Sequence, residues 1–152
     1  MTTRRGDSLE AIEPFIGELL QQAQPRERKR LMDKLMRMVR RAQVQRHRAN
    51  VEPEGGAMAP RKPRKDKKGK MFRRIGRTSS LKIRSTPDQG ELTFVNALVE
   101  QTAAVHHFGL EGFVGKTRDG RVIRTKYQAR RLLGFGDEKR DLIDEVLKHM
   151  GS

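Results

Sequence analysis

The sequence predicts an α+β fold made of an N-terminal helical hairpin, a flexible basic arm and a small antiparallel sheet with packed helices. Apolar residues recur at three- and four-residue spacing over residues 9–42, which is typical of amphipathic helices. A stretch rich in proline, glycine and lysine follows, and beyond residue 80 short runs that alternate with period two flank turn residues. We therefore expect three parts, at residues 8–49, 50–76 and 77–152.

The composition limits both the size of the core and the classes of function. The chain has 152 residues, of which 34% are apolar and 35% charged, which is lean for a single large core. Because cysteine is absent, disulfides, a thiolate nucleophile and a cysteine-type zinc site are excluded. No run of eighteen apolar residues occurs and the N-terminus lacks the apolar segment of a signal peptide, so we expect neither a membrane span nor secretion.

The net charge of +15 is concentrated in one block of the sequence. Residues 26–84 contain 22 basic and 5 acidic residues, whereas residues 85–152 contain 10 of each. Such a block attracts polyanions by releasing their condensed counterions, so nucleic acid or an acidic protein surface is a candidate partner. A solvated flexible linker is the alternative.

Two helices account for the first part. Ser8 can cap a helix from about Leu9 to Ala23. Pro25 suits the first position of a second helix, which is expected to run to about His47 and to form a hairpin with the first. The inner face of the second helix is predicted to contain Leu31, Leu35, Met38, Val39 and Ala42, and its basic outer face Arg30, Lys34, Arg37, Arg41 and Arg48.

Residues 50–76 lack apolar periodicity and are predicted to form a mobile arm. Like charges repel one another there, so the segment from about Glu52 to Lys70 is expected to be disordered in the isolated protein. Apolar residues return between Met71 and Ile75, where a short helix is predicted. The candidate contacts with a polyanion or another partner are Arg61, Lys62, Arg64, Lys65, Lys67, Lys68, Lys70, Arg73 and Arg74.

The third part begins with a β-hairpin and a helix. The runs 81–83 and 92–94 alternate with period two around turn residues that include Pro87 and Gly90. The next pattern predicts a helix from Ala97 to Phe108 that ends with Gly109 as a left-handed cap. This helix is expected to bury Leu98, Ala104, Val105 and Phe108.

Another tight turn and a closing helix complete the chain. Asp119-Gly120 is a turn signal, and a strand is predicted from Val122 towards Tyr127. Gly136 precedes a helix that has Asp137 and Glu138 at its positive end. The inner face of this helix is expected to contain Leu142, Ile143, Val146, Leu147 and Met150.

The sequence offers few candidates for catalysis. His106 and His107 could shuttle a proton or bind a metal, but neighbouring residues on a helix point about 100° apart, which argues against a joint role. Gly115-Lys116-Thr117 lacks the preceding glycine spacing of a phosphate-binding loop. We therefore expect no enzyme, no cofactor and no metal site.

Two segments of the last third resemble a known family. Val105-His106-His107-Phe108-Gly109-Leu110 and Tyr127-Gln128-Ala129-Arg130-Arg131-Leu132-Leu133-Gly134-Phe135 follow each other about one small hairpin apart. This order is similar to that of the tail completion, or virion morphogenesis, proteins of Mu-like and related contractile-tailed phages. The chain departs from the family at His107 and at Phe108, where relatives have a residue resembling Gln and a Tyr. A looser similarity covers Asn50, Pro53, Gly55, Pro60, Arg61 and Lys62.

The resemblance implies a structural protein of the virion tail or neck that is assembled in the host cytoplasm. Proteins of this family are expected to act at the head-proximal end of the tail, to enable head–tail joining and to contact other tail or neck proteins. A homo-oligomer is implied, such as a hexameric ring, with the basic arm facing DNA in the tail channel or an acidic protein. The fold or a subunit interface is expected to depend on His106, Phe108, Gly109, Tyr127, Arg130 and Arg131.

Three alternatives remain open. Arg130 and Arg131 could bind carboxylates of a neighbouring subunit or phosphates, or could form ordinary ion pairs within the chain. The whole protein could be a basic nucleic-acid-binding module unrelated to tail assembly, although Phe72 is the lone aromatic near the arm. A nuclease would require clustered carboxylates or a histidine metal set, which the sequence lacks.

Overall fold

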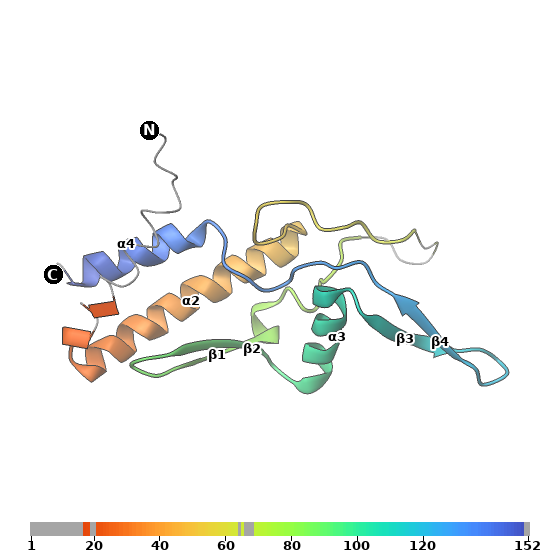
Figure 1. Cartoon of the computed structure of the whole chain (residues 1–152), viewed down its shortest axis with the longest axis horizontal. Coiled ribbons are helices and arrows are strands. Elements are labelled where there is room, and N and C mark those ends of the chain that lie inside the picture. Colours follow the sequence, from red (N-terminus) through yellow and green to blue (C-terminus); the bar gives the residue numbers. More distant parts are fainter. Residues whose placement is uncertain (1–16, 19–20, 64, 66–68, 151–152) are drawn as a thin grey trace.

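The computed structural model describes residues 17–18, 21–63, 65 and 69–150 and shows an elongated α+β arrangement (Figure 1). The helical hairpin expected at the N-terminus lies largely outside the described residues, because the predicted helix from Leu9 to Ala23 falls mostly among the others. The elements in chain order are α2 (Pro25–Ala49), the 3₁₀ helix η1 (Thr78–Ser80), β1 (Leu81–Ser85), β2 (Gly90–Phe94), α3 (Ala97–Phe108), β3 (Glu111–Lys116), β4 (Val122–Lys126) and α4 (Glu138–Met150).

Helix α2 is the longest element and forms for the reasons that the sequence gives. Pro25 stands at its start, where a missing N–H costs nothing, and Asn50 ends it in the left-handed conformation with φ +54°. The predicted basic outer face is confirmed, since its five arginine and lysine residues are all exposed. The inner face was predicted only in part, and the buried residues of α2 are Leu31, Met36, Val39, Gln43, Val44 and His47.

One core cluster forms where α4 packs against α2. Leu31 and Val146 are almost completely buried at its centre, and Leu35, Ile143 and Met150 surround them. The inner face predicted for α4 is confirmed at Ile143, Val146 and Met150 but wrong at Leu147, which is 41% exposed. A helix of thirteen residues that packs on one neighbouring helix buries only a narrow stripe, and Leu147 lies beside that stripe.

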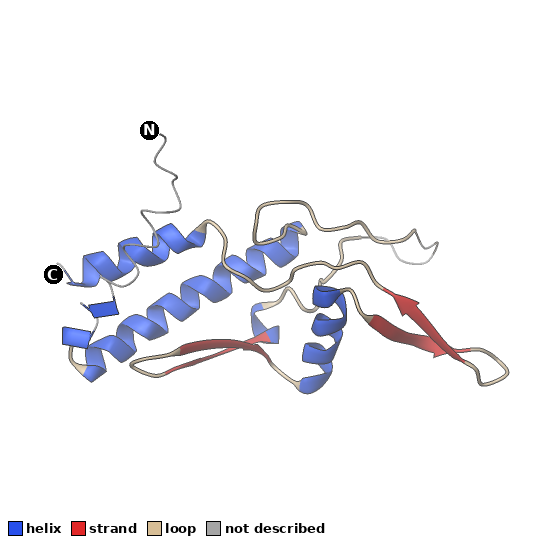
Figure 2. Ribbon diagram, in the orientation of Figure 1, coloured by secondary structure: helices blue, strands red, loops and turns tan. Residues whose placement is uncertain are grey.

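The β1–β2 hairpin also packs against α2 (Figure 2). Leu81 pairs with Phe94 and Ser85 with Gly90, so the predicted hairpin and its turn are confirmed. A side chain at Gly90 would collide with the end of Met36, which explains why the smallest residue stands where this hairpin approaches the helix. Both α4 and the β1–β2 hairpin therefore pack on α2.

A second core cluster includes residues of the segment expected to be a mobile arm. Met58 and Met71 are buried with Ala103 and Leu132, and Phe72 and Phe94 pack at the edge of this cluster. The short helix predicted at 71–75 is wrong, because consecutive turns occur there and Phe72 has φ +60°. Single methionines without periodicity are enough to attach a polar segment to a core, which a search for periodic patterns does not detect.

Helix α3 has the predicted bounds but a different buried face. Asn96 accepts a hydrogen bond from the Val99 amide at its start, and Gly109 ends it with φ +66°. Ala103 is the one buried residue of α3. Leu98 is 74% exposed and Phe108 68% exposed, so the predicted burial of these two side chains is wrong. The neighbouring elements cover only the Ala103 side of this helix.

The β3–β4 hairpin extends beyond α3 at one end of the molecule (Figure 1). Glu111 pairs with Lys126 and Lys116 with Val122, and a bulge interrupts the register between Phe113 and Gly115. The predicted turn at Asp119-Gly120 is present, with Gly120 at φ +82°. The two hairpins form separate two-stranded sheets, so the sheet part of this fold is divided.

Truncation of two leucines tests which stripe of α4 and α2 forms the core. Leu31→Ala should lower the free energy of unfolding by roughly 2 to 5 kcal/mol, because Leu31 is buried against Val146. Leu147→Ala should cost less than about 1 kcal/mol, because much of this side chain is exposed. Urea unfolding of both variants measures the difference, and equal losses would show that α4 packs through another face.

Candidate assembly interface

A segment that we call the strap, residues 127–137, joins β4 to α4 and crosses the C-terminal end of α2 (Figure 1). The Arg46 guanidinium donates to the Gly134 carbonyl at 2.7 Å, and the Gln43 amide donates to the same oxygen. His47 Nε2 lies 2.6 Å from the Leu132 carbonyl. Because residues 43, 46 and 47 are spaced three and four apart, one face of α2 binds the strap at Leu132 and Gly134.

His47 is fully buried in this contact. Its Nε2 faces a carbonyl oxygen and therefore donates, which leaves the neutral tautomer with an unprotonated Nδ1. Burial lowers the pKa of His47 below the ordinary 6.5; the Leu132 and Ile75 carbonyls oppose this effect, and the charge of Arg46 adds to it. The imidazole is consequently a neutral structural donor.

Arg46 also forms a buried ion pair with the first residue of α4. Its two terminal nitrogens lie 2.6 and 2.8 Å from the Glu138 carboxylate oxygens, and the two side chains are 14% and 7% exposed. Burial raises the pKa of Glu138, but Arg46 and the amides of Glu138 and Gly136 outweigh it and hold the pKa below its usual value. This bidentate pair fixes the start of α4 against α2.

His106 and Tyr127, two of the predicted interface residues, lie together. The His106 ring centre is 4.6 Å from that of Tyr127 and 5.1 Å from that of Phe72, in tilted and edge-to-face arrangements. Burial lowers the pKa of His106, and Arg130 and Arg61 lower it further. His107 faces elsewhere and accepts a hydrogen bond from the Leu132 amide through Nδ1, so the two imidazoles have separate structural partners.

Gly109 lies against the strap, whereas the neighbouring Phe108 is mostly exposed. A Cβ on Gly109 would lie 2.9 Å from the Ala129 amide nitrogen, so both its φ of +66° and the approach of the strap require glycine there. Phe108 contacts His107 at a centroid distance of 4.7 Å and is otherwise mostly exposed. The ring at this position is thus available to a partner, which corrects the expectation of a buried Phe.

Arg130 and Arg131 both make contacts within the chain. Arg130 is 5% exposed and donates to the Ala59 and Pro60 carbonyls at 2.6 and 2.8 Å; burial and the charge of Arg61 lower its pKa. Arg131 forms an ion pair with Glu54. Arg131 therefore forms an ion pair within the chain, which is one of the two alternatives given above. Arg130 fixes residues 59 and 60 against the strap through their main-chain carbonyls.

The candidate polyanion contacts of the basic arm are solvent-facing where the structure describes them. Arg61, Lys62, Lys65, Lys70, Arg73 and Arg74 are exposed, and Arg64, Lys67 and Lys68 lie outside the described residues. A set of exposed basic side chains next to a folded core can attract an anionic surface.

Exposed apolar side chains gather on α3 and the β3–β4 hairpin. Strands β3 and β4 make most of their contacts with each other and few with the other elements. A two-stranded hairpin is marginally stable by itself in water, so exposed apolar side chains on it are candidates for contact with another protein. The exposed apolar residues are Leu98 and Phe108 on α3, Leu110 at its end, and Phe113, Val114, Val122 and Ile123 on the hairpin.

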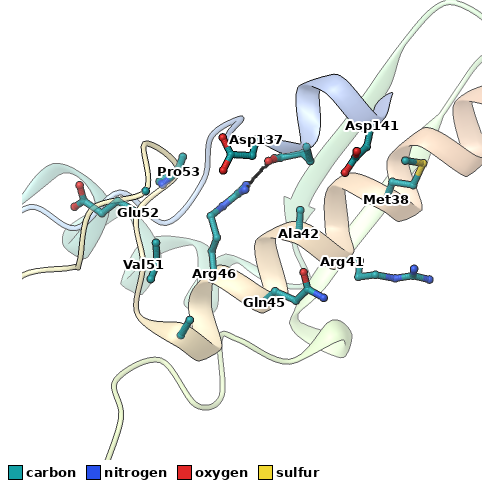
Figure 3. A pocket seen from close by; sticks show the side chains of 13 residues that line it. Met38, Arg41, Ala42, Gln45, Arg46, Val51, Glu52, Pro53, Asp137 and Asp141 are labelled. Carbon is teal, nitrogen blue, oxygen red and sulfur yellow. Dashed lines mark hydrogen bonds and ion pairs between the residues drawn. The ribbon is translucent and has the colours of Figure 1, made fainter. Parts of the chain in front are cut away.

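An open groove of about 490 Å³ lies between α2, residues 51–55 and the start of α4 (Figure 3). Met38, Ala42 and Val51 are among its apolar lining residues. Its charged lining consists of four acidic residues, Glu52, Asp137, Glu138 and Asp141, and two basic ones, Arg41 and Arg46. The groove is therefore an apolar depression with an acidic excess, in contrast to the basic outer face of α2.

The sequence prediction missed the residues that hold the strap. The sequence indicated His47 only as the approximate end of a helix and Glu138 only as an acidic residue at the positive end of another, and it indicated no role for Gln43 or Arg46. The available signal was the spacing of the three polar residues on the apolar side of α2. Their partners are main-chain carbonyls 85 to 91 positions away, which no local pattern reveals.

Within the described residues, no group of three or more histidine, aspartate or glutamate side chains is placed to hold a metal ion. None of the helices in that part of the chain combines the length and the apolar character needed to cross a bilayer.

Comparisons with known proteins agree over nearly the whole chain. A sequence model described as the phage virion morphogenesis family matches residues 7–150. The chain is 33% identical over 142 residues to the tail completion protein S of Escherichia phage P2, and the match covers 90% of this chain and 92% of that protein. No solved structure is significantly similar to it.

The buried imidazole of His47 should make stability depend on pH. Its folded pKa is lowered, so its stabilising contribution is present above about pH 6.5 and is lost as the pH falls through the folded pKa, at most by about 1.4 kcal/mol per pH unit. His47→Gln keeps a donor for the Leu132 carbonyl and removes the titration. Its denaturation midpoints between pH 8 and pH 5 should decline less than those of the wild type.

His106→Gln provides the comparison, because it removes a less buried imidazole and should flatten the pH profile less. If the profile of His47→Gln runs parallel to that of the wild type, His47 does not titrate as its burial requires.

Proposed function

Since this chain belongs to the phage virion morphogenesis family, we propose that it completes the tail of a phage during virion assembly. The observation that carries this proposal is the similarity to the tail completion protein of phage P2, which spans almost the full length of both chains. The exposed apolar surface on α3 and the β3–β4 hairpin supports a role in binding other proteins, because such surfaces are buried in assemblies.

The finer part of the proposal places the protein in the virion, at the head-proximal end of the tail. There it makes the tail competent to join a DNA-filled head, and other tail or neck proteins are its partners. Assembly takes place in the host cytoplasm. The protein works as a homo-oligomer, for which a hexameric ring suits the sixfold symmetry of tails. It acts by binding and catalyses no reaction.

Contact with DNA in the tail channel is a further part of the proposal. The basic arm and the outer face of α2 present exposed arginines and lysines, and the net charge is +15. These charges also support the second candidate function, a nucleic-acid-binding protein that has no part in tail assembly. The two functions predict different results for a phage that lacks the protein: heads and tails stay separate in the first case and are joined in the second.

A phage that lacks this protein should accumulate full heads and separate tails of normal length. Loss of a terminal component blocks joining but leaves tail polymerisation intact. Electron microscopy of lysates measures the outcome, with the same phage supplied with the wild-type chain as the control. Normal yields of joined particles without the protein would refute the assembly role and favour the second candidate.

Neutralising the arm should weaken DNA binding and its salt dependence. In Lys65→Gln with Lys70→Gln, the slope of log K against log salt should become shallower by up to about 2, because about 0.9 is lost for each phosphate contact. Lys139→Gln with Lys148→Gln removes the same charge from α4 and should keep the wild-type slope. Titration of duplex DNA at several salt concentrations decides this, and equal slopes in both double variants would exclude a specific role of the arm.

A further inference from the structure

One face of the β3–β4 hairpin combines apolar and basic side chains. Phe113 pairs with Arg124, and Val122 pairs with Lys116. Paired residues in an antiparallel ladder share a face, and residues 122 and 124 lie two apart on one strand, so all four side chains point to the same side. Phe113 and Val122 are 63% and 52% exposed, and both basic partners are also exposed.

The groove beside α4 has the complementary character. Its apolar lining comes from α2 and the segment after it, and Glu52, Asp137 and Asp141 contribute acidic groups. Figure 3 shows Asp137 and Asp141 on the α4 side of this depression, above the apolar surface of α2. Neither aspartate has an ion-pair partner within the described part of the chain.

We propose that the β3–β4 hairpin of one copy packs into the groove between α2 and α4 of a second copy. The inference rests on the homo-oligomer of the proposed function and names its contact. Phe113 and Val122 would cover the apolar lining, and Lys116 and Arg124 would face the acidic rim. The hairpin cannot fill the groove of its own chain, because it points away from α2 and α4 (Figure 1).

Charge decides between this contact and the symmetric alternative. The hairpin, residues 111–126, contains five basic and two acidic residues, so packing two hairpins face to face would bring an excess of like charge together. The groove has an acidic excess and removes that repulsion. A contact between two different surfaces is heterologous, and repetition of such a contact closes a ring when the rotation between copies permits.

Two variants interrupt the two sides of the contact. Phe113→Thr with Val122→Thr removes the apolar face while keeping residues that suit strands, and Asp141→Lys reverses one charge of the groove. The matched controls are Val95→Thr with Leu147→Thr, which are exposed outside both the hairpin and the groove lining, and Asp144→Lys, which lies on α4 outside the groove lining. Circular dichroism verifies that each purified full-length variant is folded.

Sedimentation velocity of the purified proteins at low salt tests the proposal. We expect the wild type and both controls to self-associate, and each interrupted variant to be monomeric or to associate at least tenfold more weakly. An equimolar mixture of the two interrupted variants should form a heterodimer and no larger species, because it retains one intact hairpin and one intact groove.

Three results would overturn the proposal: a monomeric wild type at low salt, an Asp141→Lys variant that assembles like the wild type, or a mixture that stays monomeric. A monomeric wild type would exclude a second copy as the partner of the hairpin. Because these measurements use the purified chain, they can fail while the lysate experiment still supports tail completion, so the two failures are distinguishable.

Discussion

The contact of the strap with helix α2 is the interaction on which the rest of the structure depends. The strap connects the half of the molecule with α3 and the second hairpin to the half with α4, and it lies on α2 through Gln43, Arg46 and His47. These are polar groups on the inner side of a helix, and each donates to a main-chain carbonyl or a carboxylate, whereas Gln43 Oε1, Arg46 Nε and His47 Nδ1 have no hydrogen-bond partner within the described residues. Removing the imidazole of His47 would leave the Leu132 carbonyl without this hydrogen bond, which costs more than the bond itself contributes. The strap is therefore a specific connection between two ends of an elongated protein.

The lean composition explains why the core of the described residues is divided into two small clusters. With 34% apolar residues there is enough material to bury α4 on α2 and to fill the region around Met58, Met71, Ala103 and Leu132. Little remains to support the β3–β4 hairpin, and apolar side chains on it stay exposed. In an isolated globular protein this arrangement would be unfavourable, but a component of an assembly can place part of its apolar surface where a neighbour will cover it. The exposed hairpin and the proposed assembly role thus have the same physical origin.

Charge is distributed so that different surfaces suit different partners. The outer face of α2 and the arm are basic, whereas the groove beside α4 has an acidic excess despite its position next to the same helix. Part of the positive charge of α2 is neutralised locally, since Arg46 binds Glu138 and Lys34 binds Glu145. What remains exposed on the outer face is free to meet an anionic partner, while the groove favours a basic one. One protein can in this way contact a polyanion and a copy of itself through separate surfaces.

The sequence by itself determined the α+β class, the bounds of α3, the first hairpin, the start of α2 and the family. These features depend on local properties: the fixed φ of Pro25, the left-handed conformation available to Gly109 and the alternation of residues 81–83 and 92–94. Which side of each helix is buried was decided by the tertiary structure, because Leu98, Phe108 and Leu147 have apolar side chains that no element among the described residues covers. The same holds for the site: the sequence indicated His106, Tyr127 and Arg130, but their partners lie up to 71 positions away. Burial and hydrogen-bond partners depend on what the rest of the chain brings close, and that information exists only in the folded molecule.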